Sequence, residues 1–308
     1  MSNRRDSQRV VVLGQIARDL VLRVSGIPGR GSSGPVGQRL EMLGGKGANQ
    51  AVGVAQLGLP VTLVGAVGDD EAAIGLLRQA AADGIDTSLI ARRPHTASGL
   101  IVSIVDADGW RYLEDLPTAV QVSCADVDRA ALAIQAAGTV VVQLQQPAAS
   151  ALAAAELGRR AGCRVILDGA PAEDGYQQRL LAAADVIRAD AHEAELLTGQ
   201  PLRNGTDAIR AGERLLDQGP SLVALAAGAD GNAIVWPGGS VLIPLSEQPV
   251  ADTTGAGDAF VAGLVASLVR GHSPARSGRN AAAAAARVVE RLGGRPALTP
   301  AIIGDSED

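Results

Sequence analysis

The stretch ADTTGAGDAF, residues 251–260, places a carboxylate directly after three small residues. Gly255, Ala256 and Gly257 precede Asp258, and Phe260 opens an apolar run that predicts a helix. Backbone N–H groups at a helix N-terminus attract anions, and glycines let a phosphate approach the backbone closely. We expect the same terminus to keep Asp258 ionised, so that it can accept a proton. A tight turn without a ligand is the alternative.

Other polar residues follow predicted strands or begin predicted helices. Asp19 comes soon after the apolar run VVVLG, GGKGANQA (44–51) precedes a helix, Asp168 ends RVILD, and Asp190 opens a helix. Ligands of parallel α/β sheets bind beyond the carboxyl ends of the strands, so these residues are expected to converge on one site. GGKGANQA is not a P-loop, because Gly47 stands where that motif has Ser or Thr.

Short apolar runs alternate with helical patterns along most of the chain. Such alternation predicts an α/β fold, a doubly wound, mostly parallel sheet with helices on both faces. The predicted strands are 10–14, 61–68, 139–144, 164–168, 185–189 and 221–227. The predicted helices are 48–57, 70–82, 149–161, 190–198 and 206–218.

Two segments break this rhythm, because their apolar residues alternate with period two. They lie at about 19–43 and 97–116, and the second contains the hairpin signal Asp106-Ala107-Asp108-Gly109. We expect these segments to form a small antiparallel β lid, which could also serve as a dimerisation face. With the lid inserted, residues 1–308 are predicted to be a single domain.

Composition and charge narrow the class of protein. The chain has 308 residues, of which 47% are hydrophobic, and a net charge of −6. A sizeable core is therefore expected, and the absence of a long basic run argues against nucleic acid as a partner. No stretch has the length of a membrane span, and Arg18 interrupts the N-terminal apolar run. Cys124 and Cys163 are expected to be buried free thiols, and the protein to be cytoplasmic.

GGKGANQA and DTTGAGDAF, taken in this order, resemble the two signatures of the ribokinase-like (PfkB) carbohydrate kinases, ribokinase above all. The resemblance covers essentially the whole chain. It implies an ATP-dependent sugar kinase that transfers the γ-phosphate to a hydroxymethyl group, with Mg²⁺ and K⁺ as ions. In this reading Asp258 is the catalytic base, and the backbone of Gly255, Ala256 and Gly257 is the anion hole for the phosphate.

The resemblance also assigns residues to the sugar and to the cation. Asp19 would hold adjacent hydroxyls, and Gly45, Lys46 and Asn49 match positions that contact the sugar. A plain surface lysine is the alternative for Lys46. The monovalent-cation site, behind the anion hole, would be formed by two residues, Asp252 and Thr254, although Asp252 fits the role of a turn-former equally well.

For the nucleotide, RADAHEAELLTG (188–199) resembles the Asn-x-x-Glu segment of the family, with Asp190 in place of asparagine. Glu193 would act on Mg²⁺ through water, while a helix cap is the alternative for Asp190. The remaining residues that the resemblance assigns to ATP are Gly228, Ala229, Gly231 and Asn280.

Departures from the family pattern gather in the sugar pocket. Gln145 stands where ribokinases carry a glutamate, and Ala17 where they carry an asparagine. We therefore expect an altered sugar pocket, with Gln145 among the substrate-binding residues. A nucleoside kinase of the same fold is one alternative, against which the low aromatic content of 2% counts. A non-catalytic sugar-binding regulator is another, against which the intact GAGD stretch counts.

Overall fold

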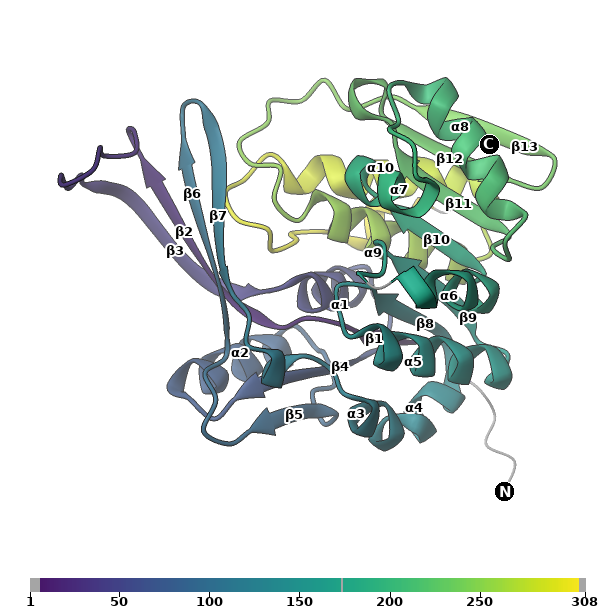
Figure 1. The fold of residues 1–308 in the computed structure, drawn as a ribbon, viewed down its shortest axis with the longest axis horizontal. Coiled ribbons are helices and arrows are strands. Elements are labelled where there is room, and N and C mark those ends of the chain that lie inside the picture. Colours follow the sequence, from purple (N-terminus) through teal and green to yellow (C-terminus); the bar gives the residue numbers. More distant parts are fainter. Residues whose placement is uncertain (1–5, 173, 305–308) are drawn as a thin grey trace.

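The computed structural model describes residues 6–172 and 174–304, and a large twisted sheet runs through its centre (Figure 1). The strand order is β13-β12-β11-β10-β9-β8-β1-β4-β5. In this sheet, as far as the structure describes it, the pairs β11–β12 and β12–β13 are antiparallel and the other neighbouring strands are parallel. The strands are β1 (Asp6–Leu13), β4 (Val61–Gly68), β5 (Ile90–Arg93), β8 (Ala137–Gln143), β9 (Arg164–Asp168), β10 (Val186–Ala189), β11 (Leu222–Ala226), β12 (Asn232–Trp236) and β13 (Gly239–Ile243).

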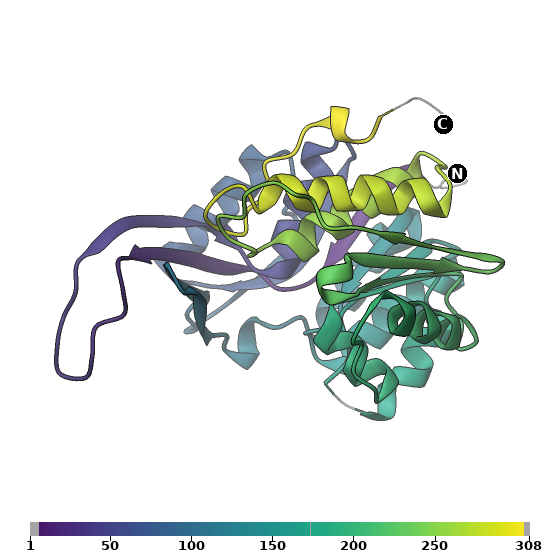
Figure 2. The same ribbon diagram turned by 90° about the horizontal axis from the view of Figure 1, so that it is seen from above.

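Helices cover both faces of this sheet, as Figure 2 shows from above. One apolar core lies under α1 (Lys46–Gln56), α2 (Glu71–Ala82), α9 (Ala256–Val269) and α10 (Pro274–Val288). The other lies under α3 (Cys124–Arg129), α4 (Ala131–Ala136), α5 (Ala148–Ala161), α6 (Gln177–Ala183), α7 (Ala191–Thr198) and α8 (Gly205–Leu216). The predicted doubly wound fold is confirmed.

Strand β1 shows why the sequence builds this arrangement. Val10 and Val12 belong to one core, whereas Val11 and Leu13 belong to the other. All four side chains are fully buried, as expected for a strand of a parallel sheet that is covered on both faces. The run ends at Gly14, where a Cβ atom would come within 2.8 Å of the Gly47 Cα atom. A glycine here lets the end of β1 meet the start of α1 at the edge where ligands collect.

A second sheet projects from the large one as the lid (Figure 1). Its order is β3-β2-β6-β7, formed by β2 (Ala17–Val24), β3 (Val36–Gly44), β6 (Gly99–Asp106) and β7 (Gly109–Asp115). The two outer pairs are antiparallel and the central pair, β2 with β6, is parallel. Asp106 pairs with Gly109 across the predicted hairpin turn.

The two cysteines differ in their exposure to solvent. Cys163 is buried, but Cys124 is exposed, so the prediction that both thiols are buried is wrong for Cys124. Cys124 is the first residue of α3, where the helix leaves its N-terminal end open to solvent. No helix among the described residues is long and apolar enough to cross a membrane.

Candidate active site

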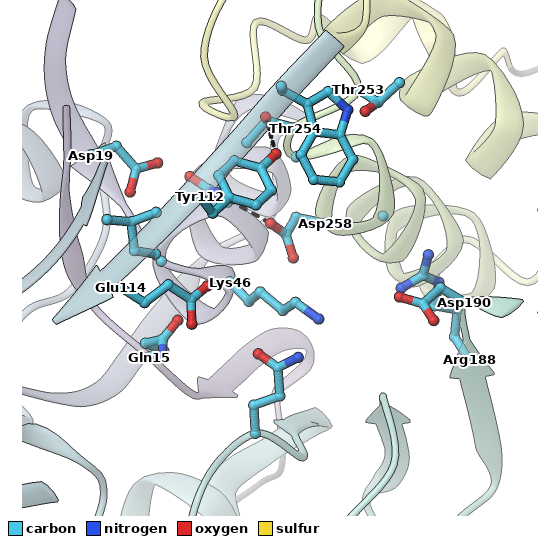
Figure 3. Close-up of a pocket in the computed structure, with 17 residues that line it drawn as sticks. Gln15, Asp19, Lys46, Tyr112, Glu114, Arg188, Asp190, Thr253, Thr254 and Asp258 are labelled. Atoms are coloured by element: carbon cyan, nitrogen blue, oxygen red, sulfur yellow. Dashed lines mark hydrogen bonds between the residues drawn. The ribbon is translucent and has the colours of Figure 1, made fainter. Parts of the chain in front are cut away.

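A cavity of about 350 Å³ lies where the carboxyl edge of the large sheet meets the lid (Figure 3). The large sheet and its helices contribute the predicted site residues, while β2, β6 and β7 contribute side chains from the lid. The lining residues are Gln15, Asp19, Gly45, Lys46, Asn49, Ile101, Trp110, Tyr112, Glu114, Gln145, Arg188, Asp190, Thr253, Thr254, Gly255, Gly257 and Asp258. Asp19, Asp190, Asp258 and the GGKGANQA segment thus meet at one cavity, whereas Asp168 is not one of the described lining residues.

Asp258 lies in the first turn of α9 and is held by two amides from α1. Asn49 Nδ2 donates to Asp258 Oδ2 over 3.2 Å, and Gln50 Nε2 donates to Oδ1 over 3.1 Å. The same Gln50 nitrogen donates to Asp168 Oδ2 over 2.7 Å. Both amides belong to the GGKGANQA segment, so the first motif of the chain orients the carboxylate of the second.

The ionisation of Asp258 differs from the expectation that it stays charged. Burial, and next the charge of Asp168, raise the pKa of Asp258 from 3.8 to about 7, against the opposing charge of Lys46. Full burial outweighs the favourable end of the helix, because a helix terminus offsets only part of the desolvation of a carboxylate. The result is a carboxyl group poised to exchange a proton near neutral pH.

The backbone before Asp258 can follow its path only because of its glycines. Gly255 has a φ of 76°, and a Cβ atom there would lie 2.0 Å from the Gly294 carbonyl oxygen. A Cβ atom at Gly257 would lie 2.7 Å from Nη2 of Arg188. The first glycine therefore permits the turn that starts α9, and the second keeps the space before the helix open.

Behind this helix start, Asp252 joins two loops. Its Oδ1 atom accepts hydrogen bonds from Thr254 N over 2.9 Å and from Thr254 Oγ1 over 2.6 Å. Its Oδ2 atom accepts one from Gly293 N, also over 2.9 Å. These bonds support the turn-forming role of Asp252. Among the described residues no group of three Asp, Glu, His or Cys side chains could hold a metal ion.

Asp19 points into the cavity from β2 and is 5% exposed. Burial, and next the charge of Asp258, raise its pKa to about 7. A Cβ atom at Gly44 would lie 1.9 Å from Asp19 Cγ, so this glycine makes room for the carboxylate. Oδ1 of Asp19 and Oδ1 of Asn49 are buried without a hydrogen-bond partner among the described residues. Two buried acceptors without donors suit a ligand that carries hydroxyl groups.

Lys46 is not a plain surface lysine. Its Nζ atom lies 2.9 Å from Glu193 Oε1, and its side chain is 29% exposed. Although burial acts in the opposite direction, Lys46 and Arg188 hold the pKa of Glu193 below its ordinary value. The other oxygen, Oε2, accepts from Asp190 N over 2.9 Å, and Asp190 Oδ1 accepts from Glu193 N over 2.8 Å. Asp190 thus caps α7, as its alternative interpretation held.

A second, apolar cavity of about 280 Å³ adjoins the first and shares Arg188, Thr253 and Gly257 with it. Its other lining residues are Ala226, Asn232, Pro244, Leu245, Ser246, Val250, Ala256, Phe260, Ala282, Ala285, Ala286 and Val289. A mostly apolar lining with a few polar groups is typical of a pocket for a small organic ligand.

Of the residues that the sequence assigned to ATP, three lie beside this apolar cavity and one does not. Gly228, Ala229 and Gly231 lie in the turn between β11 and β12, whose flanking residues Ala226 and Asn232 line the cavity. Asn280, in contrast, is not among the described residues that line it. Its Nδ2 atom donates to Ser267 Oγ over 3.0 Å, because this face of α10 packs on α9.

Several site residues were missed by the sequence reasoning. Gln50 lies within the first motif, and Arg188 is the one charged residue of the four-residue strand β10, VIRA. Trp110, Tyr112 and Glu114 recur with period two on β7 and therefore share one face of the lid. This spacing can be seen in the sequence, but the sequence does not show that these side chains line the cavity.

Trp110 and Tyr112 of the lid are two of the few aromatic residues of the chain, and both line the first cavity. Only two Trp, two Tyr and one Phe occur in 308 residues. Trp110 and Tyr112 stack with ring centroids 4.6 Å apart and line the first cavity, and Phe260 lines the second. Tyr112 Oη also shares a short hydrogen bond with Thr254 Oγ1, which ties the lid to the loop before α9. A low aromatic content therefore says little about the cavity itself.

Comparisons with known proteins agree with this geometry. The sequence model of the pfkB family carbohydrate kinases matches residues 7–301. Ribokinase from Mus musculus is 30% identical over 262 residues, which cover 84% of this chain and 81% of that protein. Deoxyribokinase from Salmonella typhi is 31% identical over 254 residues, which cover 82% and 83% of the two chains.

Solved structures show the same fold. Arabidopsis thaliana ribokinase complexed with ribose and ATP has a TM-score of 0.79 at 25% identity, covering 96% of this chain and 97% of that one. Adenosine kinase from Sinorhizobium meliloti has a TM-score of 0.78 at 23% identity, covering 96% and 98% of the two chains, a likeness of fold alone.

Proposed function

The chain belongs to the pfkB family of carbohydrate kinases and is an ATP-dependent kinase, and we propose that its acceptor is the hydroxymethyl group of a small sugar. One observation carries the assignment of the catalytic centre. Asp258, a buried carboxyl group with a pKa of about 7, lies at a glycine-rich helix start where two cavities meet. In Figure 3, Asp19 and Arg188 lie on opposite sides of it, as acceptor and nucleotide sides of one transfer site require.

In the proposed reaction Asp258 accepts the proton of the acceptor hydroxyl. The hydroxyl oxygen forms a bond to the γ-phosphorus while the bond between that phosphorus and the bridging oxygen of ADP breaks. Gly255, Ala256 and Gly257 direct backbone N–H groups at the charge that develops on the phosphoryl oxygens. Lys46, which lines the same cavity, adds a positive charge next to Asp258.

Magnesium fits this site as a partner of the phosphates and of water. Mg²⁺ is usually held by one or two carboxylates together with waters and phosphate oxygens. Both oxygens of Glu193 already accept hydrogen bonds, from Lys46 and from Asp190 N. Glu193 would therefore act through a water molecule, and when bound the ion would neutralise charge on the phosphates.

Potassium fits the loops on either side of Asp252. A buried carboxylate that already joins the Thr254 and Gly293 segments supplies a hard oxygen ligand behind the anion hole. We expect faster turnover in potassium than in tetramethylammonium buffer, because the cation would order the loop before α9. Equal rates in the two buffers would remove the cation from this proposal.

On the acceptor side, the unpaired oxygens of Asp19 and Asn49 would accept hydrogen bonds from hydroxyl groups of the sugar. Gly45, through its backbone, and Gln145, which also lines the cavity, complete this side. Ala17, the other departure from ribokinases, is fully buried and is not one of the described lining residues. The proposed change in sugar preference therefore rests on Gln145 and on the lid.

A nucleoside is the second candidate acceptor, and one observation favours it. Trp110 and Tyr112 form a stacked aromatic surface in the acceptor cavity, where a base could stack. The base-free sugar remains our first choice because its hydroxyls suffice for the two buried acceptors. The third alternative, a non-catalytic regulator, does not agree with membership of a family of kinases.

We also propose that two copies associate through the outer face of the lid. Leu20, Val102 and Leu113 are in register across β2, β6 and β7, and Leu113 is 63% exposed. These side chains lie on the face opposite Asp19 and Tyr112, because successive residues of a strand alternate. Sedimentation of the wild type and of Leu113→Lys tests this, with a dimer expected only for the wild type.

A screen of ATP consumption tests the function itself. The panel contains pentoses including D-ribose and 2-deoxy-D-ribose, hexoses, sugar phosphates and nucleosides, with Asp258→Asn as the blank. We expect one sugar to stimulate ADP release by the wild type and not by the variant. Selective turnover of a nucleoside would establish the second candidate. Turnover of none of these compounds would contradict the proposed class of acceptor.

A further inference from the structure

Arg188 occupies the boundary between the two cavities of the site. It lies in β10, lines both cavities, and its side chain is 12% exposed. The guanidinium group lies against the anion hole, because a Cβ atom at Gly257 would be 2.7 Å from Nη2 and 2.9 Å from Nη1. A phosphate that passes from the apolar cavity to the acceptor must therefore pass this cation.

The contacts of the guanidinium are directed to one side. Nη1 lies 3.0 Å from Asp168 Oδ1 and 3.8 Å from Glu193 Oε2, whereas Nη2 faces Gly257. A planar guanidinium carries five N–H donors in a fixed fork and can bind a phosphate with two of them while an ion pair holds its other side. Asp168 thus fixes the plane of the group and leaves an edge turned to the anion hole.

We propose that Arg188 binds the terminal phosphate of ATP and remains hydrogen-bonded to it during transfer, an inference that rests on the kinase function proposed above. Arg188 keeps all its protons, since the acceptor proton goes to Asp258, and its N–H groups donate to non-bridging phosphoryl oxygens. Asp168 acts as a positioning residue, because it contacts Arg188 on one oxygen and the Gln50 amide on the other.

A purely structural role for Arg188 is the competing explanation. Asp168 is fully buried, and removal of Arg188 would leave an uncompensated buried carboxylate, which destabilises a fold strongly. The two roles differ once Asp168 is neutralised. In the double variant Asp168→Asn with Arg188→Ala the buried charge is gone, but no guanidinium reaches the phosphate.

The test compares two nucleotides in complex with Mg²⁺, the β,γ-imido analogue of ATP and ADP. Their dissociation constants are measured by calorimetry for the wild type, Arg188→Ala, Arg188→Lys and the double variant, and thermal melting reports stability. Arg188→Ala should weaken binding of the ATP analogue by about 10- to 100-fold, the range of one or two charge-assisted hydrogen bonds, and binding of ADP by less than about 3-fold. Arg188→Lys should recover part of the loss.

The double variant decides between the two roles. We expect it to melt close to the wild type and still to bind the ATP analogue as poorly as Arg188→Ala. Recovery of wild-type affinity for the ATP analogue in the double variant, or equal losses for both nucleotides in Arg188→Ala, would overturn the inference. If the wild type itself binds neither nucleotide, the kinase function fails instead, so the two failures are distinguishable.

Discussion

The two ends of this site, which we propose to serve phosphoryl transfer and acceptor binding, are built in different ways. At the transfer end, the backbone of residues 255–257 and the carboxyl group of Asp258 lie at the start of α9, between helices of one buried core. At the acceptor end, the side chains of Trp110, Tyr112 and Glu114 reach in from β7, whose residues are exposed or half-buried. The first end depends on main-chain geometry that a short motif specifies. The second depends on side chains that can be exchanged without disturbing the core.

Asp258→Asn should produce the largest effect, because it acts on the transfer end. Replacing a positioned general base is expected to lower kcat by roughly 10²–10⁴-fold. The affinity for ATP should stay within a few-fold, since the backbone of the anion hole is unchanged. Steady-state kinetics with the acceptor found in the screen provides the measurement.

Asp190→Asn is the matched control for that change. It also replaces an aspartate that lines the cavity, but one that caps α7, a role that asparagine performs equally well. The control should keep most of its activity. Comparable losses in the two variants would mean that any change of charge near the cavity is harmful and that Asp258 has no special role.

A change in the lid should affect the acceptor alone. Trp110→Ala removes one ring of the stacked pair while the Tyr112 hydroxyl keeps its bond to Thr254. We expect KM for the acceptor to rise by about 10- to 100-fold, the range of one aromatic contact plus its buried area, with ATP affinity unchanged. Val250→Ala, in the apolar cavity, serves as the converse control and should weaken ATP only. If both variants affected both substrates equally, the separation of the two ends would be wrong.

The stability of the unliganded protein should show what the buried carboxyl group costs. Because the pKa of Asp258 is raised from 3.8 to about 7, the folded protein holds a proton that the unfolded chain releases between these values. Stability therefore falls as pH rises through this interval. Asp258→Asn, neutral throughout, should be more stable than the wild type at pH 8, by about 4 kcal/mol for a shift of this size, and no more stable at pH 4. Denaturation by urea at the two pH values measures this, and an equal difference at both would contradict the shifted pKa.

The smallest effect is expected at Gln145, where we propose that the sugar pocket departs from the ribokinase pattern. Gln145→Glu introduces a charged hydrogen-bond acceptor and should raise kcat/KM for D-ribose by about 3- to 10-fold, the gain of a charge-assisted bond over a neutral one. Asp19 and Glu114, which line the same cavity, limit the gain by repulsion. Gln121→Glu is the control, because Gln121 is half-buried and does not line the cavity. No gain for ribose at Gln145 would assign the sugar preference to the lid.

Much of the large sheet could be predicted from the sequence, because the apolar runs of its strands match the burial that a sheet covered on both faces requires. Runs such as VVVLG at 10–14 are apolar at every position, which only a strand covered on both faces tolerates. The GAGD segment could likewise be recognised as the start of a helix, and α9 does begin at Ala256, with Gly255 as its N-cap. The family follows from these two kinds of signal.

The ionisation of Asp258 and the placement of Arg188 could not be read in the same way. The pKa of Asp258 depends on its burial and on Asp168, which lies 90 residues earlier in the chain. Arg188 owes its position to the register of β10 beside β9, where it pairs with Asp168. The alternation of side chains along β7 can be seen in the sequence. Which face of the lid lines the cavity cannot, because it depends on how the second sheet joins the first.

The dependence of kcat/KM for the acceptor on pH tests most directly that Asp258 is the base. The free enzyme must have Asp258 ionised to accept the proton, and its pKa is raised to about 7 by burial and Asp168. The logarithm of kcat/KM should therefore rise with a slope near one below an apparent pKa of about 7, and level off above it. In Asp258→Asn this limb should vanish from the residual activity. A wild-type profile that is flat from pH 8 down to pH 5 would contradict the account.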